Sequence, residues 1–290
     1  MSLPDIWEFA SILAKLAIYA GFAGAAGLMI AKAAFPALLS SLENRIRRQA
    51  LILAILALAA SVLSFLLRGA ALTGDYTGMS DPEMLGLLWQ TPVGSVLLWR
   101  LGAAGLLVAG LAWPGFGGWI ALCGGGLGLW TLTLIGHVPE LDLTGARLLL
   151  MLHLAGIAFW IGILAPLHTL SRQPGQLHNA ALLGHRFGQA AMVAVPLLIL
   201  AGLLMAWKLV GGLSALVSTG YGQTLLVKLG LVAALLALAA VNKLRLVPAM
   251  QAGKAEAGRR LARSIEVEGV LMAAILAATA VITSVATLPA

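Results

Sequence analysis

Long apolar stretches dominate this 290-residue chain and constrain its fold more than any other feature. A helix needs about 20 apolar residues to cross a hydrocarbon core that is roughly 30 Å thick. Eight segments approach or exceed that length, and they are residues 6–31, 50–67, 93–112, 119–135, 147–167, 188–210, 225–246 and 265–285. The sequence therefore predicts an all-α bundle of eight transmembrane helices that forms a single domain over residues 1–290.

The composition excludes a water-soluble fold. Only 10% of the residues are charged and 61% are hydrophobic, whereas a soluble domain carries roughly 25% charged residues. The net charge of +7 does not indicate a nucleic-acid partner, because the basic residues are spread over short loops. The one cysteine, Cys123, excludes an intramolecular disulfide and a thiolate metal cluster.

The charges in the loops predict the orientation of the bundle. Basic residues gather in the first, fifth and seventh loops, and acidic residues gather on the other side, including the short loop 68–90. Because basic loops stay in the cytoplasm, we expect both termini and loop 68–90 to lie outside. Pro82 in that loop predicts the start of a short helix.

Two histidines are the first candidates for chemistry, because ionisable groups at membrane depth are costly to bury. His137 ends the fourth predicted span, and His153 lies one to two turns inside the fifth. The two spans are joined outside by a short loop that carries Glu140 and Asp142. Neutral imidazole suits copper and zinc, so we expect His137 and His153 to form an outward-facing metal site. The alternative is that each ring bonds a backbone carbonyl.

Other residues are weaker candidates for metal-binding side chains. Met205 lies near the outer end of the sixth span, and thioether sulfur favours Cu(I), although methionine is also a common core residue. His168 and His185, together with His178, lie in or beside the fifth loop. They form either a cytoplasmic exit site or a set of solvated histidines.

Charged residues inside the predicted spans are candidates for pathway or pairing roles. Arg100 and Lys228 are expected to reach toward the interface or to neutralise a carboxylate inside the bundle. Glu268 is expected to face the bundle interior, while Glu266 is positioned to pair with Arg263 at a spacing of three. No phosphate-binding loop or nucleophile elbow is present, so we expect the protein not to be an enzyme.

Several motifs resemble one known family. The most specific are Tyr221-Gly222 followed by Lys228, Asn242 followed by Pro248, and the segment from Arg263 to Gly269. Segments His185–Ala190, Thr91–Arg100 and Phe159–Gly162 fit the same pattern, as do Gly136-His137 and His153. Over residues 90–289 the chain thus resembles the copper resistance protein D family, whereas the first two spans match it only in hydropathy.

This resemblance implies a protein of the bacterial inner membrane that moves copper, as Cu(I) or Cu(II), from periplasm to cytoplasm. It also implies a periplasmic copper chaperone of the C type, which we expect as a separate chain. Two alternatives stay open. One is a membrane cytochrome or metal reductase that holds haem b with the same histidines, and the other is a scaffold without a ligand.

Overall fold

Every regular element in the described part of the chain is helical. The computed structural model describes residues 5–113, 115–136, 145–173 and 175–284. In chain order the elements are α1 (Ile6–Ala34), α2 (Pro36–Leu39), η1 (Ser40–Leu42), α3 (Glu43–Thr73), η2 (Tyr76–Met79), α4 (Pro82–Trp89), α5 (Pro92–Ala112), α6 (Gly117–Thr131), α7 (Ala146–Arg172), α8 (Leu177–Val210), α9 (Leu213–Ser218), α10 (Gly220–Val241), η3 (Asn242–Leu246), α11 (Val247–Gln251) and α12 (Ala255–Ile282).

Seven of the described helices are long and apolar enough to cross a membrane, so this is a multi-pass membrane protein. Two of the seven combine several elements: Pro36–Thr73 joins α2, η1 and α3, and Gly220–Gln251 joins α10, η3 and α11. Helix α6 has 15 residues, or about 22 Å at the usual rise per residue. Because α6 is shorter than a full span, the count of eight stays a prediction.

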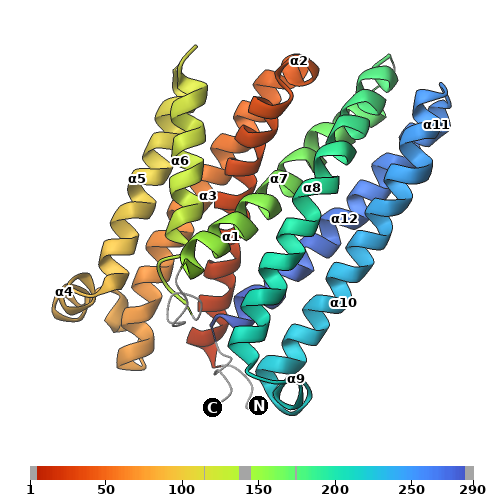
Figure 1. Ribbon diagram of the computed structural model, residues 1–290. Coiled ribbons are helices and arrows are strands. Elements are labelled where there is room, and N and C mark those ends of the chain that lie inside the picture. The colour runs from red at the N-terminus through yellow and green to blue at the C-terminus, as the bar shows by residue number, and fades with distance from the viewer. Residues whose placement is uncertain (1–4, 114, 137–144, 174, 285–290) are drawn as a thin grey trace.

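The long helices run between two ends of the bundle (Figure 1). We call the end bounded by α2 and α11 the basic end, and the end bounded by α4 and α9 the opposite end. At the basic end the helices are longer than predicted, since α3 begins at Glu43, α8 at Leu177 and α12 at Ala255. Much of the predicted basic loops is therefore helical. Arginine, lysine and glutamate are good helix formers, so the helices continue past their apolar segments.

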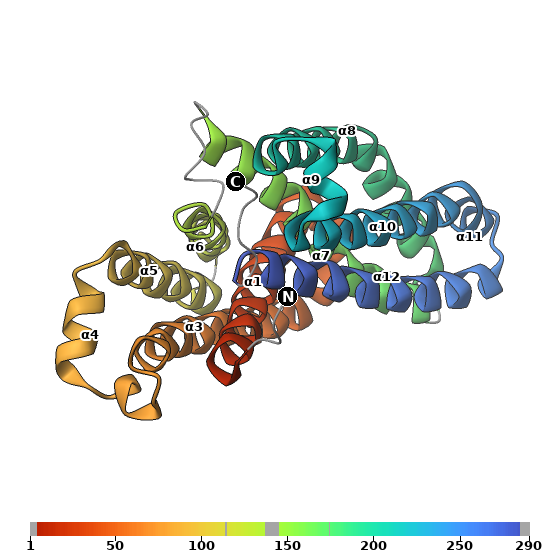
Figure 2. The ribbon, with the colours of Figure 1, turned by 90° about the horizontal axis from the view of Figure 1, so that it is seen from below.

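Helix α1 occupies the centre of the bundle and packs against α3, α6, α7 and α12. Seen from below, α3, α5 and α6 lie on one side of α1, and α7, α8, α10 and α12 lie on the other (Figure 2). Glycine permits the closest crossing, because a methyl group on Gly27 of α1 would overlap the carbonyl oxygen of Ala158 of α7. Close approach at small residues is the usual way in which membrane helices gain packing contacts.

The connection between α3 and α5 contains the predicted short helix. Helix α4 begins at Pro82, and the Asp81 carboxylate caps it by accepting from the backbone N–H of Glu83 at 2.9 Å. Proline at the first position and aspartate at the N-cap are both favourable there. Arg68 was expected in this loop but lies in the last turns of α3.

Candidate functional site

Three side chains follow one broad face of α7 and make polar contacts with the neighbouring helices α8 and α12. We call His153, Trp160 and His168 the α7 polar row. Their spacings of seven and eight residues are close to two helical turns each, so the row extends about 22 Å along the helix. Each member contacts a different partner, namely the backbone of α8, Glu268 of α12 and Glu266 of α12.

At the opposite end of the row, His153 bonds to α8. Its Nδ1 lies 2.9 Å from the carbonyl oxygen of Leu198. A carbonyl oxygen only accepts, so Nδ1 carries the proton and Nε2 keeps its lone pair. The predicted backbone bond is thus present, but it uses one ring nitrogen only. Such a bond also orients a metal-binding imidazole.

The face of α8 that meets His153 contains the predicted methionine. A methyl group on Gly202 would lie 3.0 Å from Cε1 of His153, so the absence of a side chain there makes room for the ring. Leu198, Gly202 and Met205 follow the helical spacing of four and three and share this face. Met205 is buried, one turn further toward the opposite end than Gly202.

Lys228 of α10 lies within electrostatic reach of the His153 ring. The sequence allowed an ion pair between Lys228 and an inward carboxylate. Among the described residues, the four ion pairs involve neither Lys228 nor Arg100.

In the middle of the row, Glu268 is buried with two donors. The residue is 4% exposed, which agrees with the expectation that it faces the bundle. The indole Nε1 of Trp160 donates to Oε2 at 3.2 Å, and the Asn242 amide donates to Oε1 at 2.5 Å. No sequence pattern identified Trp160 or Asn242 as a partner of this carboxylate.

Asn242 begins the π-helical segment η3, which interrupts the regular turns between α10 and α11. Pro248 follows within α11, and its missing N–H removes one α-helical hydrogen bond nearby. Single π-helical turns are frequent at functional sites. In the sequence, an asparagine in an apolar span with a proline six residues later was the pattern that could have indicated this irregular helical segment.

A cavity of about 180 Å³ borders this buried carboxylate. It lies between α7, α8, α12 and the segment formed by α10, η3 and α11. Trp160, Asn242, Lys243 and Glu268 are the polar or amphipathic residues that line it. Met192 also lines the cavity from α8. The wall thus combines a carboxylate, an amide, an amine and a thioether with a mainly apolar lining.

At the basic end, His168 lies beside Glu266. Its Nε2 is 2.9 Å from Oε1 of Glu266, and Nη1 of Arg172 is 3.5 Å from the same oxygen. Glu266 therefore pairs with α7 in place of the expected partner Arg263. His178 and His185 are exposed on α8, which agrees with the solvated alternative for these two.

Some predicted ligands lie outside the described residues: His137, Glu140 and Asp142. The proposed pairing of His137 with His153 therefore stays a prediction. Among the described residues, no three His, Cys, Asp or Glu side chains gather as a metal-binding group. A metal ion at His153 would therefore need a two-coordinate or mixed ligand set, for which Met205 is the candidate among the described residues.

Comparison with known proteins finds a matching family model in each half of the chain. Residues 5–142 match the model of the copper resistance protein D-like N-terminal domain, and residues 181–282 match the model of copper resistance protein D. The copper transport protein CutJ of Bacillus subtilis (strain 168) is 28% identical over 178 residues. That alignment covers 56% of this chain and 32% of the relative. No solved structure matches significantly.

The family match extends to helices that sequence motifs did not reach. The first two spans were similar to the family only in hydropathy, yet they fall within the matched N-terminal residues. The C-terminal match includes Asn242 and Glu268, two of the residues that form the buried polar centre. This chain belongs to the copper resistance protein D family.

Proposed function

We propose that this protein moves copper across the bacterial inner membrane along the α7 polar row. The observation that carries the proposal is the row itself, because it places two imidazoles on one face of α7 and, between them, Trp160 bonded to the buried Glu268 carboxylate of α12. Buried ionisable groups inside membrane helices mark ion pathways. The name of the Bacillus relative, a copper transport protein, supports the same cargo.

The proposed route begins at the opposite end of the bundle. Nε2 of His153 and the Met205 thioether are the described ligands for an arriving ion, and His137 is proposed as a further one. Imidazole and thioether together favour Cu(I). The Nδ1 bond to Leu198 holds the ring in the tautomer that binds metal.

The middle of the route is the cavity beside Glu268. A buried carboxylate offsets the charge of a cation in a medium of low dielectric constant, where such attraction is strong. Asn242 and Trp160 hold the two carboxylate oxygens in place, so the acceptor stays oriented as the ion passes. His168 and Glu266 then provide the exit at the basic end.

The topology proposed with this route has eight spans, with α6 as the fourth. Both termini then lie in the periplasm and the basic end lies in the cytoplasm, as the distribution of basic residues favours. Copper then moves from periplasm to cytoplasm. A separate periplasmic chaperone of the C type is the proposed donor, and no chemical conversion of a substrate is involved.

Uptake of copper into liposomes that contain the purified protein tests this proposal. His153→Ala should lower the initial rate at least about tenfold, the scale on which metal sites respond to lost contacts. His178→Ala, which changes an exposed histidine with no described partner, is the matched control. Equal rates for wild type and His153→Ala would refute the route. An absorbance spectrum with a Soret band would instead favour the haem alternative.

A further inference from the structure

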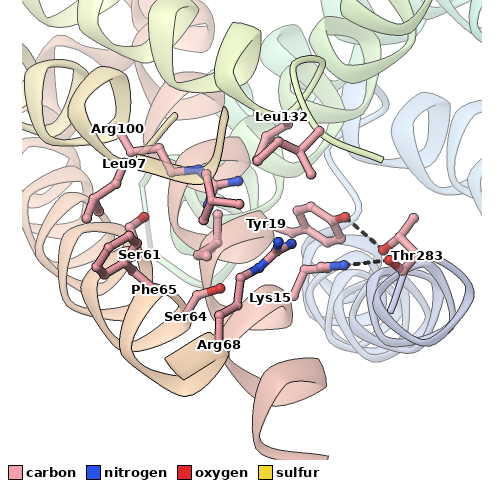
Figure 3. A pocket seen from close by; sticks show the side chains of 13 residues that line it. Lys15, Tyr19, Ser61, Ser64, Phe65, Arg68, Leu97, Arg100, Leu132 and Thr283 are labelled. Carbon is pink, nitrogen blue, oxygen red and sulfur yellow. Dashed lines mark hydrogen bonds between the residues drawn. The ribbon is translucent and has the colours of Figure 1, made fainter. Parts of the chain in front are cut away.

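A second cavity lies among the helices of the N-terminal half, away from the α7 polar row. It has a volume of about 50 Å³ and opens between α1, α3 and α5 near the end of α12 (Figure 3). Its polar lining consists of Lys15, Tyr19, Ser61, Ser64, Arg68 and Arg100, with Thr283 at the rim. Three of these side chains are cationic.

None of the described residues that line it carries a carboxylate. None of the four ion pairs between described residues involves Lys15, Arg68 or Arg100. The three cations are close enough to interact electrostatically with one another. Lys15 and Arg100 are half-buried, whereas Arg68 is exposed. Like charges that converge on partly buried positions of a membrane bundle are costly unless something of opposite sign lies between them.

Arg100 is one of the cationic residues that lack a partner of opposite charge, and one of its atoms also lacks a hydrogen bond. Its Nε is buried and has no hydrogen-bond partner among the described residues. Figure 3 shows the guanidinium groups of Arg100 and Arg68 directed into the cavity from two different helices. A buried donor left without an acceptor costs about 1–3 kcal/mol, so an acceptor in the cavity would stabilise this arrangement.

Lys15 and Tyr19 are held by Thr283, the C-cap residue of α12. Lys15 Nζ donates to the Thr283 carbonyl oxygen at 2.6 Å. The Thr283 hydroxyl donates to the Thr279 carbonyl oxygen at 2.9 Å, so at 3.0 Å from the Tyr19 oxygen it accepts the tyrosine proton. Ser61 likewise donates to the Ala57 carbonyl oxygen. The donors left for a ligand are therefore the two guanidinium groups, the remaining ammonium protons of Lys15 and the hydroxyl of Ser64, which also lines the cavity.

We propose that this cavity binds one small inorganic anion, of chloride or phosphate size, between Arg68, Arg100 and Lys15. Guanidinium and ammonium groups are the donors that proteins use for such ions. The cavity volume of about 50 Å³ is large enough for a small ion, because a cavity needs roughly 10–15 Å³, measured in the same way, to hold a single water molecule. The anion cancels the repulsion between α1, α3 and α5 and so strengthens the contact with the end of α12.

The site is separate from the proposed copper route. Its lining comes from α1, α3, α5, the residues that follow α6, and Thr283, and it includes no member of the α7 polar row. Three cations repel a free copper ion, so this cavity is closed to that cargo. The anion-binding proposal can therefore be tested independently of the copper-transport proposal.

Binding of radiolabelled chloride and radiolabelled phosphate to the full-length protein in neutral detergent tests the proposal. Sodium gluconate keeps the ionic strength constant, and its anion is too large for the cavity. Wild type should bind one of the two ions saturably, and its thermal unfolding temperature should rise over the same concentrations. Arg100→Gln and Arg68→Gln should each weaken binding at least about tenfold, because a charged donor is replaced by a neutral one.

Arg186→Gln is the control, since Arg186 is exposed at the basic end of α8 and should bind the ion like wild type. If Arg100→Gln does not fold, Arg68→Gln and Lys15→Gln measure the same loss. Absence of saturable binding of both ions overturns the proposal, as does an equal loss in Arg186→Gln. Stabilisation by added phosphatidylglycerol, without binding of either free ion, assigns the cavity to a lipid headgroup and also overturns it.

Discussion

Trp160 of α7 donates its indole proton to Glu268 of α12 at 3.2 Å, and this bond joins two helices at the centre of the membrane bundle. Both side chains are almost completely buried. Asn242 donates to the second carboxylate oxygen, so three helical segments meet at one carboxylate. A buried charge is tolerated only when its oxygens are bonded in this way.

Glu268→Ala should therefore destabilise the protein. The substitution leaves the Trp160 indole and the Asn242 amide as buried donors without an acceptor, at about 1–3 kcal/mol each. The thermal unfolding temperature of the purified protein in detergent measures the effect. Glu266→Ala is the control, because that carboxylate is largely exposed and should change the unfolding temperature little. If Glu268→Ala is as stable as wild type, the two hydrogen bonds to Glu268 contribute nothing to the stability of the fold.

Gly27→Ala should also lower the stability of the bundle, through packing. The added methyl group would overlap the carbonyl oxygen of Ala158, and overpacking of this kind typically costs about 1–3 kcal/mol. Gly230→Ala is the matched control, since nothing lies within 4 Å of the corresponding position on α10. Alanine is a better helix former than glycine, so the control should be neutral or slightly stabilising in the same unfolding assay.

The variant Met205→Leu tests the role of the thioether sulfur alone, because it removes the sulfur and keeps a side chain of similar size. Leucine has a similar volume, so the fold should keep its stability, whereas the affinity for Cu(I) should fall because the sulfur ligand is gone. Competition with a Cu(I)-specific chromogenic chelator measures the affinity. Met29→Leu, in the core around α1, should leave the affinity unchanged. Identical affinities in the two variants would remove Met205 from the site.

Hydropathy and charge predicted much of this structure. The helices follow from the need to satisfy every backbone group within the membrane, and Glu268 was expected to face inward because a charge on the lipid face is costly. The short helix at Pro82 followed from local rules of helix initiation.

Other features depend on packing between distant segments. The contacts of Glu268 with Trp160 and Asn242 span 108 and 26 residues, and no local pattern predicts which helix faces meet. The cationic cavity was not predicted either, since Lys15, Arg68 and Arg100 are each an isolated basic residue in the sequence. The ends of α3, α8 and α12 were missed because charged helix formers prolong a helix beyond its apolar segment.

Copper uptake by liposomes that contain Glu268→Gln is the most direct test of the proposed route. Glutamine has nearly the same shape as glutamate and keeps a carbonyl oxygen as the acceptor for Trp160. Its NH2 group can donate to Oδ1 of Asn242, which has no hydrogen-bond partner among the described residues, once the Asn242 amide turns over. The unfolding temperature should therefore change little while the negative charge is lost. The initial uptake rate should fall at least about tenfold, because an oppositely charged group at close range stabilises a cation by several kcal/mol in the protein interior. Glu256→Gln, at the exposed start of α12, should transport like wild type. Wild-type uptake by a folded Glu268→Gln protein would contradict a copper path along α7.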